Sequence, residues 1–180
     1  MIFISAGHNP KGIKTDPGAV ANGYKEADLN VIIRDLVIRE LKRLNVAFVS
    51  DRDDESLGDY LTRIKTGNGS VVLEFHFDAA APTATGTTAL IEADADRLDK
   101  AFAKELADTT AMTLGIRNRG VKSETESHRG RLALMREEGI ICLLEVGFIT
   151  NKQDMILFMA NKEVLAMRIA QILIKYEKMI

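Results

Sequence analysis

VVLEFHF, at residues 71–77, is an apolar run whose later residues bring in an acid and a histidine. Its β-branched start predicts a strand. Side chains alternate across a strand, so Phe75 and Phe77 share one face. Three polar side chains share the other face: Glu74, His76 and Asp78. A histidine between two carboxylates at the end of an apolar strand favours a functional site, and a polar surface face is an equal alternative.

Apolar runs and helical patterns alternate along the rest of the chain. Five further runs predict strands: residues 1–5, 46–51, 86–94, 131–135 and 140–148. Four stretches show the apolar period of amphipathic helices: 26–44, 57–64, 98–109 and 162–176. The polar, basic stretch 113–130 predicts a surface loop that carries function. Strands that alternate with helices predict an α/β domain with a parallel or mixed sheet.

Length predicts a single domain, and composition gives no sign of a nucleic-acid or membrane partner. The chain has 180 residues and a formal net charge of -2, so nothing favours nucleic acid or an anionic membrane as a partner. No apolar run reaches the roughly 18 residues of a membrane span. The one cysteine, Cys142, lies in an apolar run and is expected to be an inert buried thiol.

Two histidines and a glutamate fall where parallel strands would bring them together. His8 and His76 lie at the ends of predicted strands, and ligands of open α/β sheets bind at that edge. Glu26 opens the first predicted helix. Two imidazoles, one carboxylate and a water form a frequent catalytic zinc set. Taken singly, His8 also fits a turn, and Glu26 fits a carboxylate favoured by the helix dipole.

A further carboxylate, Glu145, comes directly after the apolar start of the run 140–148. A buried carboxylate is costly unless it is paired or has a chemical task. Beside a metal site, it would take a proton from water and later deliver one to a leaving amine. The sequence contains no G-x-S-x-G elbow, Walker loop or G-x-G-x-x-G, so a serine hydrolase and a nucleotide-binding protein lack support.

Three other titratable residues are weaker candidates. His128 is expected to be an ordinary loop histidine. Asp16 and Asp28 fit either a brace for a metal ligand or a cap of a turn or helix start.

Several longer stretches resemble one family of enzymes. In chain order they are AGHN (6–9), DPGAVANGYKEADLN (16–30), HFDAA (76–80) followed by GTT, NRGVK (118–122) and LLEVGFITNKQD (143–154). Together they resemble the zinc-dependent N-acetylmuramoyl-L-alanine amidases, the type-3 amidase family of cell-wall hydrolases and phage endolysins. The resemblance implies a single catalytic domain over residues 1–180, with a twisted, mostly parallel six-stranded sheet, helices on both faces and no separate wall-binding domain.

The resemblance also implies the roles of individual residues. His8, Glu26 and His76 would be the Zn²⁺ ligands and Glu145 the catalytic carboxylate. The reaction would be cleavage of the amide between N-acetylmuramic acid and L-alanine of the stem peptide, with peptidoglycan or muropeptides as substrate. One segment resembles a substrate-facing strip: Asn118, Arg119 and Lys122. Its cations could meet stem-peptide carboxylates, and a solvated basic loop is an equal alternative.

Three positions depart from the family pattern. Ser5-Ala6 stands where the family has an Asp-Pro or similar pair, and Glu74-Phe75 stands where it has a serine and an aliphatic residue. Asp78 stands where the family has an asparagine, and it is expected to contact a metal ligand without binding the metal itself. The added carboxylates would make the site more acidic, which could tighten metal binding or raise the pKa of bound water.

The expected role is a lysis enzyme (endolysin) or an autolysin. No secretory signal opens the sequence, so we expect synthesis in the cytoplasm and action on the cell wall after holin-type release. Three other functions stay open: a cytosolic role in muropeptide recycling, a zinc peptidase that cuts within the stem peptide, and a wall-binding module without catalysis.

Overall fold

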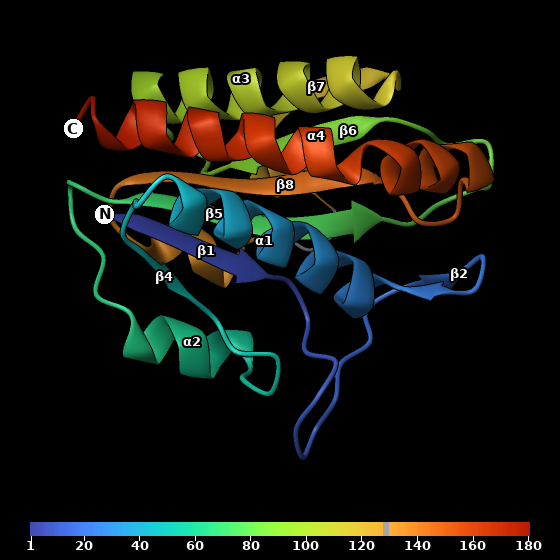
Figure 1. Cartoon of the computed structure of the whole chain (residues 1–180), viewed down its shortest axis with the longest axis horizontal. Helices are drawn as coiled ribbons and strands as arrows, with labels where there is room; N and C mark the ends of the chain where they lie inside the picture. The colour runs from blue at the N-terminus through green and yellow to red at the C-terminus, as the bar shows by residue number, and fades with distance from the viewer. Residues whose placement is uncertain (128–129) are drawn as a thin grey trace.

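A computed structural model describes residues 1–127 and 130–180 of the chain as one α/β domain (Figure 1). A six-stranded sheet has the order β4-β1-β5-β8-β6-β7. The strands are Ile2–Ala6 (β1), Phe48–Ser50 (β4), Val71–Asp78 (β5), Thr87–Ile91 (β6), Asn118–Ser123 (β7) and Ile140–Phe148 (β8). Every neighbouring pair is parallel except β6 and β8, so the sheet is mixed and mostly parallel, as predicted. A small hairpin pairs Val20–Ala21 (β2) with Tyr24–Lys25 (β3).

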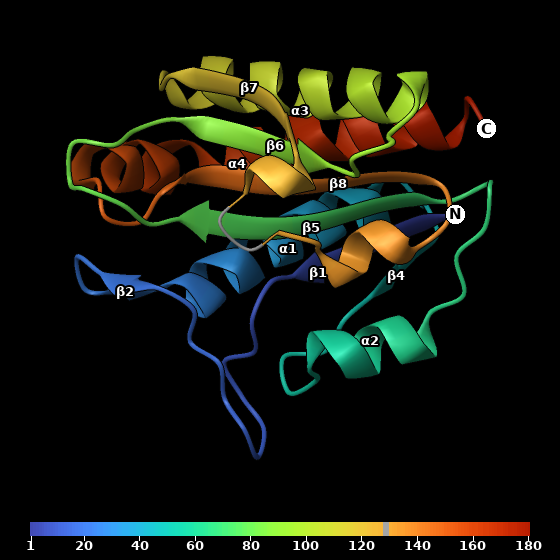
Figure 2. The same ribbon diagram turned by 180° about the vertical axis from the view of Figure 1, so that it is seen from behind.

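Helices cover both faces of the sheet, but unequally. Three long helices pack together on one face: Glu26–Arg43 (α1), Arg97–Leu114 (α3) and Lys152–Glu177 (α4). The other face carries the short helix Leu57–Arg63 (α2) and the 3-10 helices Glu124–Glu126 (η1) and Ala133–Arg136 (η2), as the reverse view shows (Figure 2). This second face is less covered, which leaves room for a site above β5, β8 and β6.

The apolar period of each helix explains its packing. In α1 the residues Leu29, Ile33 and Val37 are buried against the sheet, and in α4 Phe158 and Ile169 are buried beside them. The aromatic residues of β5 point into this same core, so the polar residues between them face the opposite side. The thiol of β8 is also fully buried, which confirms the prediction for Cys142.

The prediction of a strand at residues 131–135 was wrong. Residues 133–135 belong to η2, and residues 131 and 132 precede it without strand pairing. The buried carboxylate of Glu124 accepts a hydrogen bond from the Leu132 N–H at 2.6 Å and pairs with Arg136. These contacts hold the segment as a turn over the sheet.

The sixth strand lies within the segment that was predicted to be a loop. Residues Asn118–Ser123 form β7 at the edge of the sheet, paired in parallel with β6. Edge strands are commonly charged and contain glycine, which is why this one lacked an apolar strand pattern. Helix α4 also begins earlier than predicted, because Asn151 caps it by accepting hydrogen bonds from the N–H groups of Gln153 and Asp154.

The parallel direction of β1, β5 and β8 places their carboxyl ends at one edge of the sheet. His8 follows the end of β1, and His76 and Glu145 lie near the ends of β5 and β8. Among the described residues, no helix is long and apolar enough to cross a membrane.

Candidate metal centre

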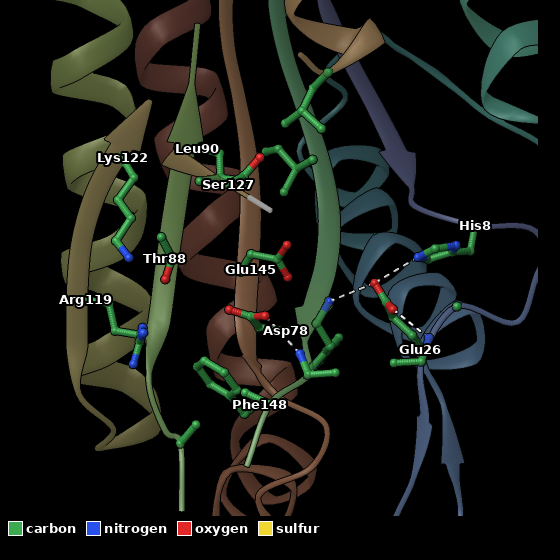
Figure 3. Close-up of a pocket in the computed structure, with 18 of the residues that line it drawn as sticks. His8, Glu26, Asp78, Thr88, Leu90, Arg119, Lys122, Ser127, Glu145 and Phe148 are labelled. Atoms are coloured by element: carbon green, nitrogen blue, oxygen red, sulfur yellow. Dashed lines mark hydrogen bonds and ion pairs between the residues drawn. The ribbon is translucent and has the colours of Figure 1, made fainter. Parts of the chain in front are cut away.

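The sheet edge and the start of α1 bring His8, Glu26 and His76 together, as the sequence predicted. Figure 3 shows two of these side chains, His8 and Glu26, next to each other. One potential ligand atom from each lies within 4.8 Å of the others. Glu26 Oε1 is 3.1 Å from His8 Nε2 and 2.9 Å from His76 Nδ1. Glu26 is 1 % exposed and His76 is 4 % exposed, so water screens these charges little. The three side chains could hold a metal ion.

A carboxylate holds the other nitrogen of each histidine. His8 Nδ1 lies 2.7 Å from Asp16 Oδ2, and His76 Nε2 lies 3.0 Å from Glu74 Oε1. A metal-binding histidine usually donates its second ring N–H to such a carboxylate, which fixes the tautomer and the ring orientation. The contacts therefore leave His8 Nε2 and His76 Nδ1 as the atoms that face the centre.

The pKa values reflect this chain of contacts. Burial favours protonation of Glu26, but hydrogen bonds from His76 and His8 outweigh burial and hold the pKa of Glu26 well below its usual range. Burial also opposes a charge on His76, yet its hydrogen bonds to Glu26 and Glu74 raise its pKa to about 10. The same competition raises the pKa of His8. The groups thus form a site with strong attraction for positive charge.

Two glycines make room for the centre. A Cβ at Gly7 would lie 2.1 Å from His76 Cε1 and Nε2. A Cβ at Gly18 would lie 2.6 Å from Glu26 Oε2, and Gly18 has a φ of +63°, which L side chains rarely adopt. His8 itself has a φ of 66°, a strained backbone conformation of the kind that occurs at functional sites. The loop is therefore shaped around the His and Glu side chains.

A cleft of about 530 Å³ opens beside the centre, and we call it the β7-side cleft. Besides His8 and Glu26, its walls include Asp78, Thr88, Arg119, Lys122, Glu145 and Phe148. Glu145 is the register partner of His76 across the β5–β8 pair, so its carboxylate enters the cleft next to the centre (Figure 3). The arrangement combines a cation site, a neighbouring carboxylate and space for a substrate.

The predicted substrate strip separates into two environments. Arg119 and Lys122 reach toward the cleft from β7 (Figure 3). Asn118 instead donates a hydrogen bond to Asp108 of α3 at 2.6 Å and does not line this cleft.

The other predicted residues also take distinct places. The Asp78 carboxylate accepts a hydrogen bond from the Ala79 N–H at 2.9 Å and lines the cleft, whereas the carboxylates that contact the His76 ring are Glu74 and Glu26. Asp28 is exposed in the first turn of α1. His128 lies outside the described residues.

Two supports of the centre go beyond the prediction, which gave Glu74 only as an added negative charge and did not name Asn30. Glu74 shares a face with His76, but only the structure shows that its Oε2 also accepts a hydrogen bond from Ser5 Oγ at 3.0 Å. Asn30 of α1 donates a hydrogen bond to the carbonyl of Gly7 at 2.8 Å. The signal for Glu74 was present in the i, i+2 spacing, whereas Asn30 and Gly7 are 23 residues apart and gave none.

Comparison with known proteins agrees with this geometry. Residues 2–175 match the N-acetylmuramoyl-L-alanine amidase family known as Amidase_3. The chain belongs to this family. Over 157 residues it is 27% identical to the uncharacterised protein YqiI of Bacillus subtilis, a match that covers 85% of this chain and 72% of YqiI. It is also 27% identical over 162 residues to the N-acetylmuramoyl-L-alanine amidase LytC of the same organism, but the match spans only 30% of LytC.

Solved structures of the Amidase_3 family share the fold. An N-acetylmuramoyl-L-alanine amidase from Clostridium difficile 630 superposes with a TM-score of 0.78 at 23% identity, over 98% of this chain and 96% of that one. A proposed N-acetylmuramoyl-L-alanine amidase from Neisseria meningitidis gives a TM-score of 0.77 at 31% identity, over 97% and 93%. The family is one of zinc-dependent cell-wall hydrolases, and the His, Glu, His group of this amidase is consistent with a zinc site.

Proposed function

We propose that this amidase hydrolyses the amide between the lactyl group of N-acetylmuramic acid and L-alanine of the stem peptide in peptidoglycan. The observation that carries the proposal is the placement of Glu145 next to the His8, Glu26 and His76 centre, at the edge of an open cleft. A hydrolase of an unactivated amide needs both an electrophilic centre and a group that moves protons.

The donor set fits Zn²⁺. Two imidazole nitrogens and one carboxylate oxygen are the ligands of many catalytic zinc sites, which keep a position open. When bound, the ion would polarise the amide carbonyl and lower the pKa of water. Asp16 and Glu74 would keep the two imidazoles in the tautomers that present His8 Nε2 and His76 Nδ1 to the ion.

Glu145 supplies the proton transfer. Its backbone is fixed in β8, where its carbonyl accepts a hydrogen bond from Thr87 Oγ1 at 2.7 Å. Its carboxylate is therefore held at the cleft wall beside the centre (Figure 3). There it would accept a proton from the attacking water and deliver it to the departing L-alanine nitrogen, which leaves as a neutral amine.

The test is amine release from purified peptidoglycan, with identification of each new N-terminal residue. We expect new N-terminal alanine from the zinc-loaded protein, no release with a chelator, and none from Glu145→Gln. The matched control is Glu138→Gln, which removes an exposed carboxylate outside the cleft and should keep full activity. Glu145→Gln should still bind zinc, which separates loss of catalysis from loss of the centre.

Other products would point to the alternatives. New termini at a later stem residue would identify a peptidase, and wall binding without any new terminus would identify a binding module. Neither alternative has an observation of its own in its favour.

We propose the bacterial cell wall as the place of action, either in lysis or in wall remodelling. The reaction is the same in both roles, so a cellular assay must distinguish them. Lysis of a culture only when a holin is expressed together with this amidase would support a lysis enzyme. Altered wall turnover in growing cells without a holin would support an autolysin.

A further inference from the structure

The metal centre lies between two hollows. One is the β7-side cleft. The other, of about 340 Å³, opens toward α2 and is called the α2-side cleft; its walls include Asn9, Ser56, Leu57, Gly58, Ala133 and Leu134. His8 and Asp16 line both hollows, so the two meet at the centre. Helix α2 and strand β7 lie toward opposite edges of the sheet (Figure 2), so a substrate that fills both hollows would cross the strands.

Two basic side chains, Arg119 and Lys122, lie in the β7 wall of the β7-side cleft. Lys122 is half-buried in its wall, and among the described residues no carboxylate lies within ion-pairing distance of its ammonium group. Arg119 is placed over the ring of Phe148, with its guanidinium carbon 5.0 Å from the ring centre. That stacking holds the guanidinium in one position at the wall. Two placed cations suit a ligand that carries carboxylates.

Two carboxylates of the same cleft are already engaged with the backbone. Asp78 accepts a hydrogen bond from the Ala79 N–H at 2.9 Å, and Glu126 accepts one from the Ser123 N–H at 2.9 Å. These bonds occupy part of their acceptor capacity, whereas no described residue accepts a hydrogen bond from the Lys122 ammonium group.

The α2-side cleft has a neutral rim. Within residues 1–127 and 130–180, the charged or titratable groups in its walls belong to the centre and its supports: His8, Asp16, Glu74 and His76. Away from the centre, the walls are small, aliphatic or uncharged polar groups, among them Ala133, Ser56 and Asn9. The Ser56 hydroxyl caps α2 through Asp59, and the Asn9 amide donates to two carbonyls of its own loop. Such walls suit an uncharged ligand such as an N-acetylated sugar, which would pack against them.

The position of Glu145 gives an independent reason to assign the two sides. Glu145 lines the β7-side cleft and not the α2-side cleft. The group that protonates the departing nitrogen must lie on the side toward which that nitrogen leaves. In the proposed reaction this nitrogen is the first atom of the stem peptide.

We propose that the stem peptide binds in the β7-side cleft and the glycan strand in the α2-side cleft. This assignment rests on the proposed amidase function and adds the direction of the substrate. Lys122 and Arg119 would bind stem-peptide carboxylates, and the rim of Ser56, Leu57 and Gly58 would contact the sugars beyond the scissile bond.

The glycan side is tested by filling the α2-side cleft. A Cβ at Gly58 would meet nothing closer than Ser56 Oγ at 3.9 Å, and Gly58 has no positive φ, so Gly58→Phe is compatible with the fold. Ala133→Phe fills the same cleft from η2 and is an independent variant, because Ala133 is exposed. The matched control is Gly69→Phe, where a Cβ would meet nothing within 4 Å and which lines neither cleft.

The peptide side is tested by removing one charge. Lys122→Gln deletes a cation that has no ion pair among the described residues, so little of the fold should change. The matched control is Lys65→Gln, an exposed lysine that lines neither cleft.

The substrates are two series of defined muropeptides. In the first, one stem peptide is carried on one, two or four sugars. In the second, one disaccharide carries stems whose carboxylates are free or amidated. The measured quantities are KM and kcat for each variant, together with the equilibrium binding of the two products, free stem peptide and free glycan.

We expect Gly58→Phe to lower kcat/KM about tenfold on the four-sugar substrate and little on the single sugar, mainly through KM. Lys122→Gln should lower kcat/KM about tenfold on free-carboxylate stems and little on amidated ones. The reverse pattern, or equal losses on all substrates, would overturn the assignment. If the wild-type protein releases no N-terminal alanine from any substrate, the amidase proposal itself fails before any variants are compared.

Discussion

Gly7 lies so close to the His76 ring that Gly7→Ala tests the geometry of the metal centre directly. A Cβ at Gly7 would lie 2.1 Å from two ring atoms of His76, whereas ordinary contacts begin near 3.4 Å. Gly7 cannot shift away easily, because its N–H donates to the Phe75 carbonyl at 2.9 Å and its own carbonyl accepts from Asn30 at 2.8 Å. The His76 ring must therefore move by about 1.3 Å, the difference between these two distances.

Such a movement disrupts the contacts of the ring. His76 Nε2 is 3.0 Å from Glu74 and Nδ1 is 2.9 Å from Glu26, so a displacement of this size takes at least one of them beyond hydrogen-bond range. Overpacking costs about 1–3 kcal/mol, and a hydrogen bond to a charged group contributes about 1.5–3 kcal/mol. We expect the free energy of unfolding of the metal-free protein to fall by about 2–4 kcal/mol. For a chain of this size, each kcal/mol corresponds to a drop in Tm of about 2–4 °C.

Gly7→Ala should reduce the affinity for zinc more strongly than it reduces the stability of the metal-free protein. Loss of a residue that supports a metal ligand typically weakens metal binding about 10–100-fold. Displacing a ligand itself should therefore weaken zinc binding by at least about 100-fold. At a zinc concentration about 100 times the wild-type Kd, stabilisation by zinc would fall from about 2.7 kcal/mol to about 0.4 kcal/mol. Thermal unfolding with and without zinc measures this change, and competition with a chromophoric chelator gives the Kd.

The matched control is Gly69→Ala, because a Cβ there would meet nothing within 4 Å. It should leave both Tm and zinc affinity at wild-type values. If Gly7→Ala binds zinc within about threefold of the wild-type protein, the reasoning that Gly7 makes room for a metal-binding His76 is refuted.

Other contacts of the centre and of the core are open to similar tests. The raised pKa of His76 stabilises the metal-free protein fully below about pH 6.5, and this contribution is lost as pH rises toward about 10. Zinc binds the deprotonated imidazole, so zinc should stabilise the protein more as the pH rises. The drop in Tm caused by a chelator should therefore grow from about pH 6.5 to about pH 9. A drop that stays constant over this range would contradict the assignment of His76 as a zinc ligand. Asp16→Asn should weaken zinc binding about 10–100-fold by releasing His8, with little change in the fold, as a chelator competition would show. Asp154→Ala should lower the free energy of unfolding in urea by about 3–4 kcal/mol, because its buried carboxylate accepts hydrogen bonds from Thr85 and from two backbone N–H groups; a loss below about 1 kcal/mol would refute this role.

The spacing of apolar residues along the sequence determined the fold class and most of its helices and strands. Apolar residues recur with the helical period in α1, and aromatic and polar residues alternate in β5. Each pattern identifies the buried face of its element, because the side chains that share a face are buried together. The pattern failed where tertiary contacts override it. Strand β7 has an exposed edge and few apolar residues, and its strand conformation depends on pairing with β6. The apolar stretch at 131–135 leads into η2, where the buried carboxylate of Glu124, outside the stretch, accepts a hydrogen bond from the Leu132 N–H.

The sequence by itself also marked the candidate residues for the chemistry. Histidines and acids at strand ends pointed to His8, His76 and Glu145 when taken together, the type of ligand is one that suits zinc, and the family resemblance implied their roles. Only the tertiary structure decided how they are held and oriented. The spacing of Glu74 and His76 put both on one face of a strand, but which ring nitrogen each of Asp16 and Glu74 contacts, and how closely Gly7 approaches His76, depend on how the loops and strands fold onto one another. The two hollows that flank the centre likewise arise from the packing of α2, η2 and β7 around the sheet, and so does the direction in which a substrate can lie.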